Sequence, residues 1–426
     1  MKNRKNIFFR GLSILLLAAV SGCTFFNSDK PPLPGQRESI FDINNLPKED
    51  VLANKPENLA YKKNKSWPVT GGALSHIVGP VVLGNDFSRQ EYESFSNSGS
   101  GAVYFMQPLI KGDNLYLLSC KNEVFSLDKN NLETKWKFRP KLEVDCPLVG
   151  GIAVNEKKVI LVAPEGKVFA LSRGTGEVVW EKDLEEPMRG APTFSNKNII
   201  LQSKDNKVYG LSIETGDIVW NFSSSMEGLS FLKNSNAAVY KGKILAVLTS
   251  GDVVMLRGDN GAVLWHDKLD AQADKDELSL LSNTQASPLL EDIYAFIFTQ
   301  QQLIAFDQRN GRQLWEEPVG GHLKPAVSKT HIFLVDKRGL IVALEKSNGK
   351  IAWISKLPSS DKSRFGPYIT SSGILVFNDD KALFFGVKDG LLKKEIKLEA
   401  APITAPSIVD NKVYILDRDK HISVYG

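Results

Sequence analysis

A repeated phrase that ends in tryptophan constrains this chain most. Six of its seven tryptophans close the phrase, and these six stand 38 to 50 residues apart. In five copies a glycine stands four residues before the tryptophan: Gly176–Trp180, Gly216–Trp220, Gly261–Trp265, Gly311–Trp315 and Gly349–Trp353. A degenerate copy, Leu132–Trp136, lacks the glycine, and a second degenerate copy, Gly390–Lys394, lacks the tryptophan. A period of about 40 residues is typical of the four-stranded blades of a propeller, which bury their apolar faces only against neighbouring blades.

An alternating apolar run precedes each complete phrase. The runs are Val168–Leu171, Val208–Leu211, Val253–Leu256, Leu303–Phe306 and Ile341–Leu344. They are rich in β-branched and aromatic residues and are bounded by turn residues, which predicts short antiparallel strands. Two further strands precede each run, so each repeat supplies four strands. The glycine of the phrase provides the positive φ that a tight hairpin turn needs.

The count of repeats predicts an all-β fold, an eight-bladed β-propeller of four-stranded antiparallel blades over residues 67–426. The tryptophan phrases and the Lys394 copy make seven units, and residues 405–426 offer three more strands without a phrase. We expect the strand around Trp67 to pair with Ile422–Tyr425, so that an N-terminal strand closes the last blade and leaves no open edge. The repeated tryptophans are predicted to pack between blades. The alternative, that they line a ligand site, requires polar ligands for a cofactor.

The N-terminus predicts export and lipid attachment. A basic start, residues 1–10, is followed by the apolar run 11–20 and then by small residues before Cys23. The run is short for a membrane span, and the pattern resembles the lipobox of bacterial lipoproteins, in which the cysteine is acylated. We therefore predict a signal peptide over 1–22 and a flexible tether over 23–66. The alternatives are an ordinary signal peptide and, within the tether, a short docking motif at 33–37.

Charge and cysteine content narrow the class further. The formal net charge is +4, and four basic residues lie in the predicted signal peptide, so the mature chain is near neutral. It therefore lacks the excess of positive charge that is typical of a nucleic-acid-binding protein. Apart from Cys23, the chain has Cys120 and Cys146. In an oxidising compartment these two form a candidate disulfide, because both are predicted in loops on the same face of the ring.

No pattern of catalytic or metal-binding residues stands out. The five histidines, at 76, 266, 322, 331 and 421, are dispersed, and nucleophile-elbow and phosphate-loop motifs are absent from the sequence. The run 128–131 begins like a calcium loop but lacks the later ligands, so we interpret it as a hairpin turn. His266–Asp267 is interpreted as a solvent-facing pair at a blade edge. We predict no catalytic residue, no cofactor and no metal.

Two family resemblances follow from these residues. The repeat resembles that of the pyrroloquinoline quinone (PQQ) dehydrogenases, but in fold alone, because that family has a vicinal cysteine pair whereas Cys120 and Cys146 are 26 positions apart. The lipobox, the proline-rich tether, Trp67-Pro with Gly71-Gly72, the eight repeats and the phrase at 187–193 together resemble the BamB family. Its members are propeller lipoproteins of the outer-membrane β-barrel assembly machinery.

The second resemblance implies a partner and a docking surface. It implies a cofactor-free propeller at the periplasmic side of the outer membrane, bound to the polypeptide-transport-associated domains of the barrel-inserting subunit, BamA. The family's docking phrase maps its last two members onto Met188 and Arg189, and its first leucine becomes Glu186. The family's second contact group falls in the next loop, at Leu229, Leu232 and Asn234, where Asn234 matches one of two aspartates and the other has no counterpart.

The resemblance also leaves alternatives open. We expect Met188 and Arg189 in a loop that enters a blade, with their side chains facing outward, and the alternative is that Arg189 braces the next blade. Exposed blade edges offer a further hypothesis, the pairing of an extended client segment with a strand. The rival functions are a PQQ-dependent dehydrogenase and a propeller lipoprotein that binds another cell-envelope partner, such as peptidoglycan.

Overall fold

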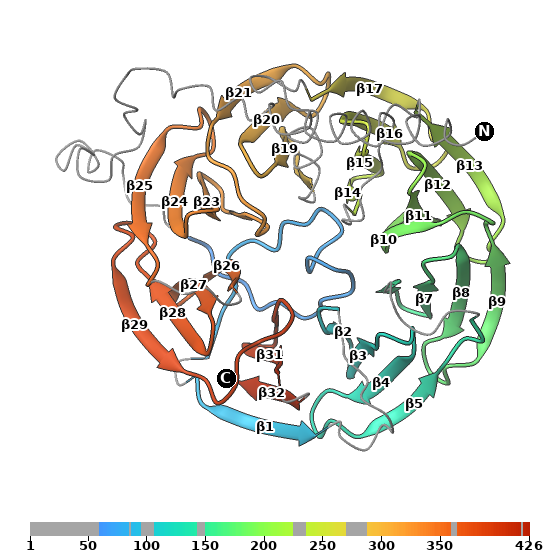
Figure 1. The fold of residues 1–426 in the computed structure, drawn as a ribbon, viewed down its shortest axis with the longest axis horizontal. Coiled ribbons are helices and arrows are strands. Elements are labelled where there is room, and N and C mark those ends of the chain that lie inside the picture. The colour runs from blue at the N-terminus through green and yellow to red at the C-terminus, as the bar shows by residue number, and fades with distance from the viewer. Residues whose placement is uncertain are drawn as a thin grey trace, which may run out of the picture. The chain divides into compact units, whose positions relative to one another are not determined.

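The computed structural model describes residues 59–84, 87–94, 106–142, 150–224, 236–269, 288–358, 364–418 and 421–426. Their strands, β1 to β32, form eight four-stranded antiparallel sheets that follow one another around a ring (Figure 1). No helix occurs in these ranges. The predicted eight-bladed β-propeller is therefore confirmed.

Each of the first seven blades is one continuous segment whose first strand is innermost and whose fourth strand lies on the outside (Figure 1). Blades 1 to 4 comprise β2 (Leu109–Lys111), β3 (Asn114–Leu118), β4 (Val124–Asp128) and β5 (Thr134–Phe138); β6 (Gly151–Val154), β7 (Lys158–Val162), β8 (Lys167–Ser172) and β9 (Val178–Asp183); β10 (Met188–Ser195), β11 (Asn198–Ser203), β12 (Lys207–Ser212) and β13 (Ile218–Ser223); and β14 (Ala238–Tyr240), β15 (Lys243–Val247), β16 (Asp252–Arg257) and β17 (Val263–Lys268).

Blades 5 to 7 repeat this order, and each alternating apolar run of the sequence is found in the third strand of its blade, as predicted. These blades comprise β18 (Leu289–Leu290), β19 (Tyr294–Phe298), β20 (Leu303–Asp307) and β21 (Gln313–Glu317); β22 (Ala326–Val327), β23 (His331–Val335), β24 (Leu340–Glu345) and β25 (Ile351–Lys356); and β26 (Arg364–Thr370), β27 (Gly373–Asn378), β28 (Lys381–Phe385) and β29 (Leu392–Lys397).

The eighth blade joins the two ends of the described chain. Its inner strands are β30 (Ser407–Val409), β31 (Lys412–Leu416) and β32 (His421–Tyr425), and its outer strand is β1 (Arg89–Ser94), which pairs antiparallel with β32. An N-terminal strand therefore closes the ring, but the expectation that it is the strand around Trp67 is wrong. Trp67 is 1% exposed and pairs with Ile110 of β2 instead. Trp67 lies in the central part of the ring and belongs to the core cluster, whereas the outer position of blade 8 is taken by the polar strand β1.

The repeated tryptophans pack between blades, as predicted. We call the contact between two adjacent blades a seam. At six seams the tryptophan of one blade donates its Nε1 hydrogen to a backbone carbonyl of the next, at 3.0–3.3 Å: Trp136 to Arg173, Trp180 to Ile213, Trp220 to Gly258, Trp265 to Gln308, Trp315 to Lys346 and Trp353 to Val387.

The phrase glycine of the next blade faces the same indole. Gly261, for example, has φ +71°, and a Cβ placed there would lie 2.5 Å from Trp220. The glycine is therefore fixed by its backbone angle, as predicted, and also by the tryptophan of the preceding blade, which sequence reasoning missed.

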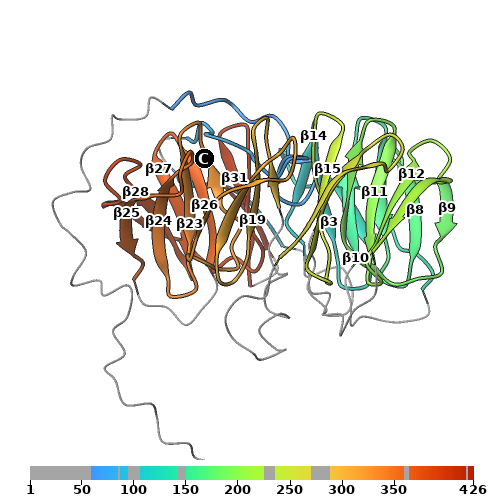
Figure 2. The same ribbon diagram turned by 90° about the horizontal axis from the view of Figure 1, so that it is seen from above.

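Residues 59–84, which we call the central segment, run across the middle of the ring at one end of it (Figures 1 and 2). Its backbone bonds to strands of several blades, for example Pro68 O with Val154 N at 2.8 Å and Leu74 O with Val239 N at 2.7 Å. Leu59 and Tyr61, which fall in the predicted tether, pack against the core of blades 6 and 7. The central segment thus ties non-adjacent blades together.

Candidate functional site

The predicted docking phrase is only partly a loop. Met188 opens β10, is 5% exposed and packs in a core cluster with Ile199 and Leu201. The expectation that its side chain faces outward is wrong, because the strand begins at this residue and directs an apolar side chain into the blade interior. Arg189 follows it on β10, where its backbone lies opposite Gln202. Leu229, Leu232 and Asn234 lie outside the described residues.

A buried acid precedes the phrase. Glu186 is 8% exposed and accepts hydrogen bonds from the Tyr209 hydroxyl and, at 3.1 Å, from Lys207 Nζ. Lys207 and Tyr209 are two positions apart on β12, so both side chains leave the strand on one face. This alternation was visible in the sequence, but nothing there connected it to Glu186. The acid stands where the family phrase has leucine, and it holds the segment before β10 against blade 3.

Backbone hydrogen bonds brace the same segment from both sides. Met188 N donates to Pro164 O at 2.9 Å, in blade 2, and Lys204 N donates to Pro187 O at 2.9 Å, in blade 3. The residues that lead into β10 are therefore held between two blades. A side chain placed at this position is presented by a rigid frame, which lowers the entropic cost of binding a partner.

An apolar band lies on the outer strands of three consecutive blades. Its members are 42–53% exposed: Val178 and Val179 on β9, Ile218 and Val219 on β13, and Val263 on β17. They occupy the same positions of the repeat, just before the tryptophan. These outer strands pair on one side only, so the band borders unpaired strand edges.

The predicted disulfide involves Cys120 and Cys146. Cys120 lies in the turn between β3 and β4, as expected, and is buried, and no disulfide joins it to another described residue. Cys146 and the lipidation candidate Cys23 lie outside the described residues. Both assignments stay predictions.

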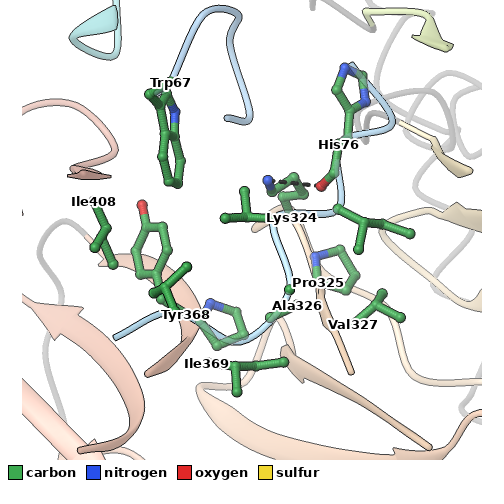
Figure 3. A pocket seen from close by; sticks show the side chains of 14 residues that line it. Trp67, His76, Lys324, Pro325, Ala326, Val327, Tyr368, Ile369 and Ile408 are labelled. Carbon is green, nitrogen blue, oxygen red and sulfur yellow. Dashed lines mark hydrogen bonds between the residues drawn. The ribbon is translucent and has the colours of Figure 1, made fainter. Parts of the chain in front are cut away.

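A cavity of about 210 Å³, which we call the central pocket, lies where the central segment meets the starts of blades 6, 7, 8 and 1. Its lining is Thr70, Gly71, His76, Gln107, His322, Leu323, Lys324, Phe365, Gly366, Pro367, Tyr368 and Ala405. Figure 3 shows a smaller cavity beside it, which shares His76, Lys324 and Tyr368 and is bounded on its far side by Trp67.

Lys324 is the charged group of the central pocket. Its Nζ donates to Gly71 O at 2.5 Å and to His76 O at 3.0 Å, and the second bond is drawn in Figure 3. Burial lowers the pKa of Lys324 to about 8. Burial and the neighbouring Lys324 charge lower the pKa of His76 to about 4, so this imidazole is neutral at pH 7 and its Nδ1 hydrogen bonds to Pro288 O at 2.8 Å.

One serine–histidine–aspartate cluster occurs away from the pocket. Asp252, 5% exposed, accepts hydrogen bonds from Ser224, from Ser250 at 2.6 Å and from His266 at 2.9 Å. Both hydroxyls bond to the carboxylate and not to the imidazole, so His266 is not placed as a base for either serine. His266 is exposed to solvent, as interpreted, but its carboxylate partner is Asp252 on the neighbouring strand and not Asp267.

Metal-binding clusters and membrane-spanning helices are also absent from the described ranges. No group of three or more histidine, cysteine, aspartate and glutamate side chains that could hold a metal ion is found there. Nor do these ranges contain a helix that is long and apolar enough to span a membrane.

Comparison with known proteins gives one family and a shared fold. Residues 123–355 match the sequence profile of the family described as outer membrane protein assembly factor BamB. A protein of that name from Xanthomonas campestris is 30% identical over 341 residues, covering 77% of this chain and 83% of the relative. The Escherichia coli protein of that name is 28% identical over 427 residues, covering 98% of each chain.

Solved structures share the propeller at lower sequence identity. BamB from Moraxella catarrhalis superposes with a TM-score of 0.67 at 17% identity, over 79% of this chain and 99% of that one. A quinohemoprotein alcohol dehydrogenase from Comamonas testosteroni superposes with a TM-score of 0.64 at 14% identity, over 85% of this chain and 80% of that one. At these identities the two structures show the fold alone.

Proposed function

This chain belongs to the family of the outer membrane protein assembly factor BamB, and from that premise we propose that it is a non-enzymatic scaffold for the assembly of outer-membrane proteins. The observation that carries the proposal is the sequence match, which extends over 98% of the chain with the Escherichia coli relative. The architecture agrees with such a role, because a closed ring holds its interblade segments in fixed positions. The likeness to quinohemoprotein dehydrogenases is one of fold and gives no ground for proposing their reaction.

We propose that the scaffold is attached to the periplasmic face of the outer membrane. The attachment point is Cys23, acylated after removal of residues 1–22. The predicted tether that follows would give the ring reach, and its described residues Leu59 and Tyr61 pack against blades 6 and 7. One acyl-bearing residue would then carry the whole membrane attachment.

The partner we propose is the barrel-inserting subunit, BamA, through its polypeptide-transport-associated domains. The docking surface is centred on Arg189, with Leu229, Leu232 and Asn234 in the next interblade connection. Met188 acts from inside the blade, where its buried side chain fixes the start of β10. The Glu186–Lys207–Tyr209 cluster fixes the segment before it. Arginine is favoured at interface positions that lose water on binding, which suits a side chain on a braced strand end.

The proposal is tested by affinity purification of the tagged, full-length chain from detergent-solubilised membranes. We expect the barrel-inserting subunit to co-purify in near-stoichiometric amount and the Cys23→Ala variant to lose the membrane fraction. Recovery of peptidoglycan fragments or another envelope protein in place of the barrel-inserting subunit would overturn the assignment. Quinone absorbance after addition of PQQ and calcium would instead favour the dehydrogenase alternative.

A further inference from the structure

The central pocket has a charge that the described residues do not balance. Its lining includes Lys324, His76 and His322 but no aspartate or glutamate. The two described partners of Lys324 Nζ are neutral carbonyls of the central segment. An ammonium group that is withdrawn from water and lacks a counter-ion is unfavourable, and a bound anion relieves that cost.

The ammonium is also positioned in advance. Two backbone carbonyls hold it at 2.5 and 3.0 Å, and an ammonium has three hydrogens, so one donor remains. Figure 3 shows Nζ on the side of the chain that faces Trp67 and Tyr368. Lys324 is half-buried and lines the pocket. An incoming ligand therefore meets a fixed charge and does not have to order a flexible lysine.

Two further polar groups beside this charge lack partners. Thr70 Oγ1, in the pocket lining, and Trp67 Nε1, at the adjoining cavity, are buried and have no hydrogen-bond partner within the described structure. Trp67 is 1% exposed, so water does not reach its ring from outside the cavity. Buried polar groups are nearly always satisfied in folded proteins, and unsatisfied ones indicate an occupant that is not part of the chain.

Apart from Gln107 and the two histidines, the remaining side chains of the lining are apolar or aromatic. Leu323, Phe365, Pro367 and Ala405 line the same cavity, together with the ring of Tyr368. The Tyr368 hydroxyl already donates to Pro406 O at 2.9 Å, and burial raises its pKa, so it stays neutral. A pocket with one cation, one free hydroxyl and apolar walls suits a ligand with one anionic group and an apolar body.

We propose that the central pocket binds a small organic carboxylate, with Lys324 Nζ and Thr70 Oγ1 on the carboxylate and Phe365, Pro367 and Leu323 around its apolar part. The charge pairs with the ammonium, and the hydroxyl donates to a carboxylate oxygen. This site is separate from the docking surface on blades 3 and 4, and the inference does not depend on the proposed scaffold role.

The test uses benzoate and its neutral isostere benzamide as probes. Isothermal titration calorimetry on the full-length mature chain at pH 7 measures the affinity of both. We expect saturable binding of benzoate and binding of benzamide weaker by about tenfold or more, because a charge-assisted hydrogen bond is lost. Equal affinities, or no saturable binding of benzoate, would overturn the proposal.

Three variants locate the site. Lys324→Met should weaken benzoate binding by about tenfold or more, and Thr70→Val by about fivefold, the effect of one hydrogen bond. Lys158→Met is the control, because Lys158 is a buried lysine of blade 2 that donates to the carbonyl of Ile213 and pairs with Glu214, and it does not line the pocket. It should bind benzoate as the wild type does.

The variants remain decisive if one of them is unstable. Lys324 also holds the central segment, so Lys324→Met has to be checked by thermal melting first. If it does not fold, Lys324→Arg keeps the charge and should keep the preference for benzoate over benzamide, while Thr70→Val still tests the second contact. Unchanged benzoate affinity in a folded Lys324→Met variant, or a loss of the same size in Lys158→Met, contradicts the site.

Discussion

The six seams that carry a tryptophan differ from the two that close the ring. At a tryptophan seam, the phrase of one blade supplies the indole, and the next blade supplies the phrase glycine that faces it and a carbonyl, just before that glycine, that accepts its hydrogen. The seams of blade 8 have no such pair, because Lys394 stands at the tryptophan position of blade 7 and β1 contains no tryptophan. Other side chains fill these two seams instead.

Phe87 and Leu132 show how the closing seams are filled. Phe87, 3% exposed, packs against Phe384 of blade 7 and stacks on Tyr425 of blade 8, where a tryptophan would otherwise lie. Leu132 stands at the glycine position of blade 1 with φ 60° and is 2% exposed. No preceding tryptophan occupies the space over it, so a side chain fits there. A repeat therefore loses its consensus glycine or tryptophan where the adjacent blade lacks the residue that would pack against it.

The largest expected effect comes from removing the closing residues. A chain that starts at residue 95 lacks β1, Phe87 and the central segment, so we expect it not to fold into a closed ring. A chain that starts at residue 59 keeps these contacts and should melt close to the temperature of the mature protein. Thermal melting by circular dichroism of both truncations measures this, and a cooperative, wild-type-like melt of the shorter chain would contradict the account.

A tryptophan seam is broken more locally by filling its glycine. Gly261→Ala places a Cβ 2.5 Å from Trp220 at φ +71° and should cost about 4 kcal/mol in the free energy of unfolding, from overpacking and the positive φ together. Gly79→Ala is the matched control, since Gly79 has φ +74° and open space around its Cβ. It should cost about 1 kcal/mol. If urea denaturation gave the same loss in the free energy of unfolding for both variants, contact with the tryptophan would not explain the effect of Gly261→Ala.

These two cases show what the sequence could and could not predict. The blade count and the third strands were predictable, because each depends on a phrase of a few consecutive residues. The closing strand was not predictable, because β1 is polar and no pattern in its sequence indicates that it pairs with β32. Met188 was misplaced for a related reason. A family phrase gives the position of a residue in the chain, but its burial depends on where β10 begins.

A smaller, pH-dependent effect should separate the central segment from the tryptophan seams. The pKa of His76 is about 4 in the folded chain and 6.5 in the unfolded one, so the unfolded state binds more protons between these values and stability falls as pH falls from 6.5 to 4. The loss amounts to about 3 kcal/mol. His76→Gln should flatten the difference between the free energies of unfolding at pH 7 and pH 4.5, and an unchanged difference would contradict the assignment.

The most direct test is whether Arg189, a residue outside the repeat phrase, is needed to bind the partner. We expect Arg189→Ala to weaken binding of the barrel-inserting subunit by about 2 kcal/mol, roughly 30-fold, with an almost unchanged melting temperature. Arg312→Ala, an exposed arginine inside the phrase of blade 5, is the control and should bind as the wild type does. Co-purification from solubilised outer membranes measures both. Wild-type recovery of the partner by a folded Arg189→Ala chain would contradict the docking assignment, and unfolding of that variant would show that Arg189 braces the blade instead.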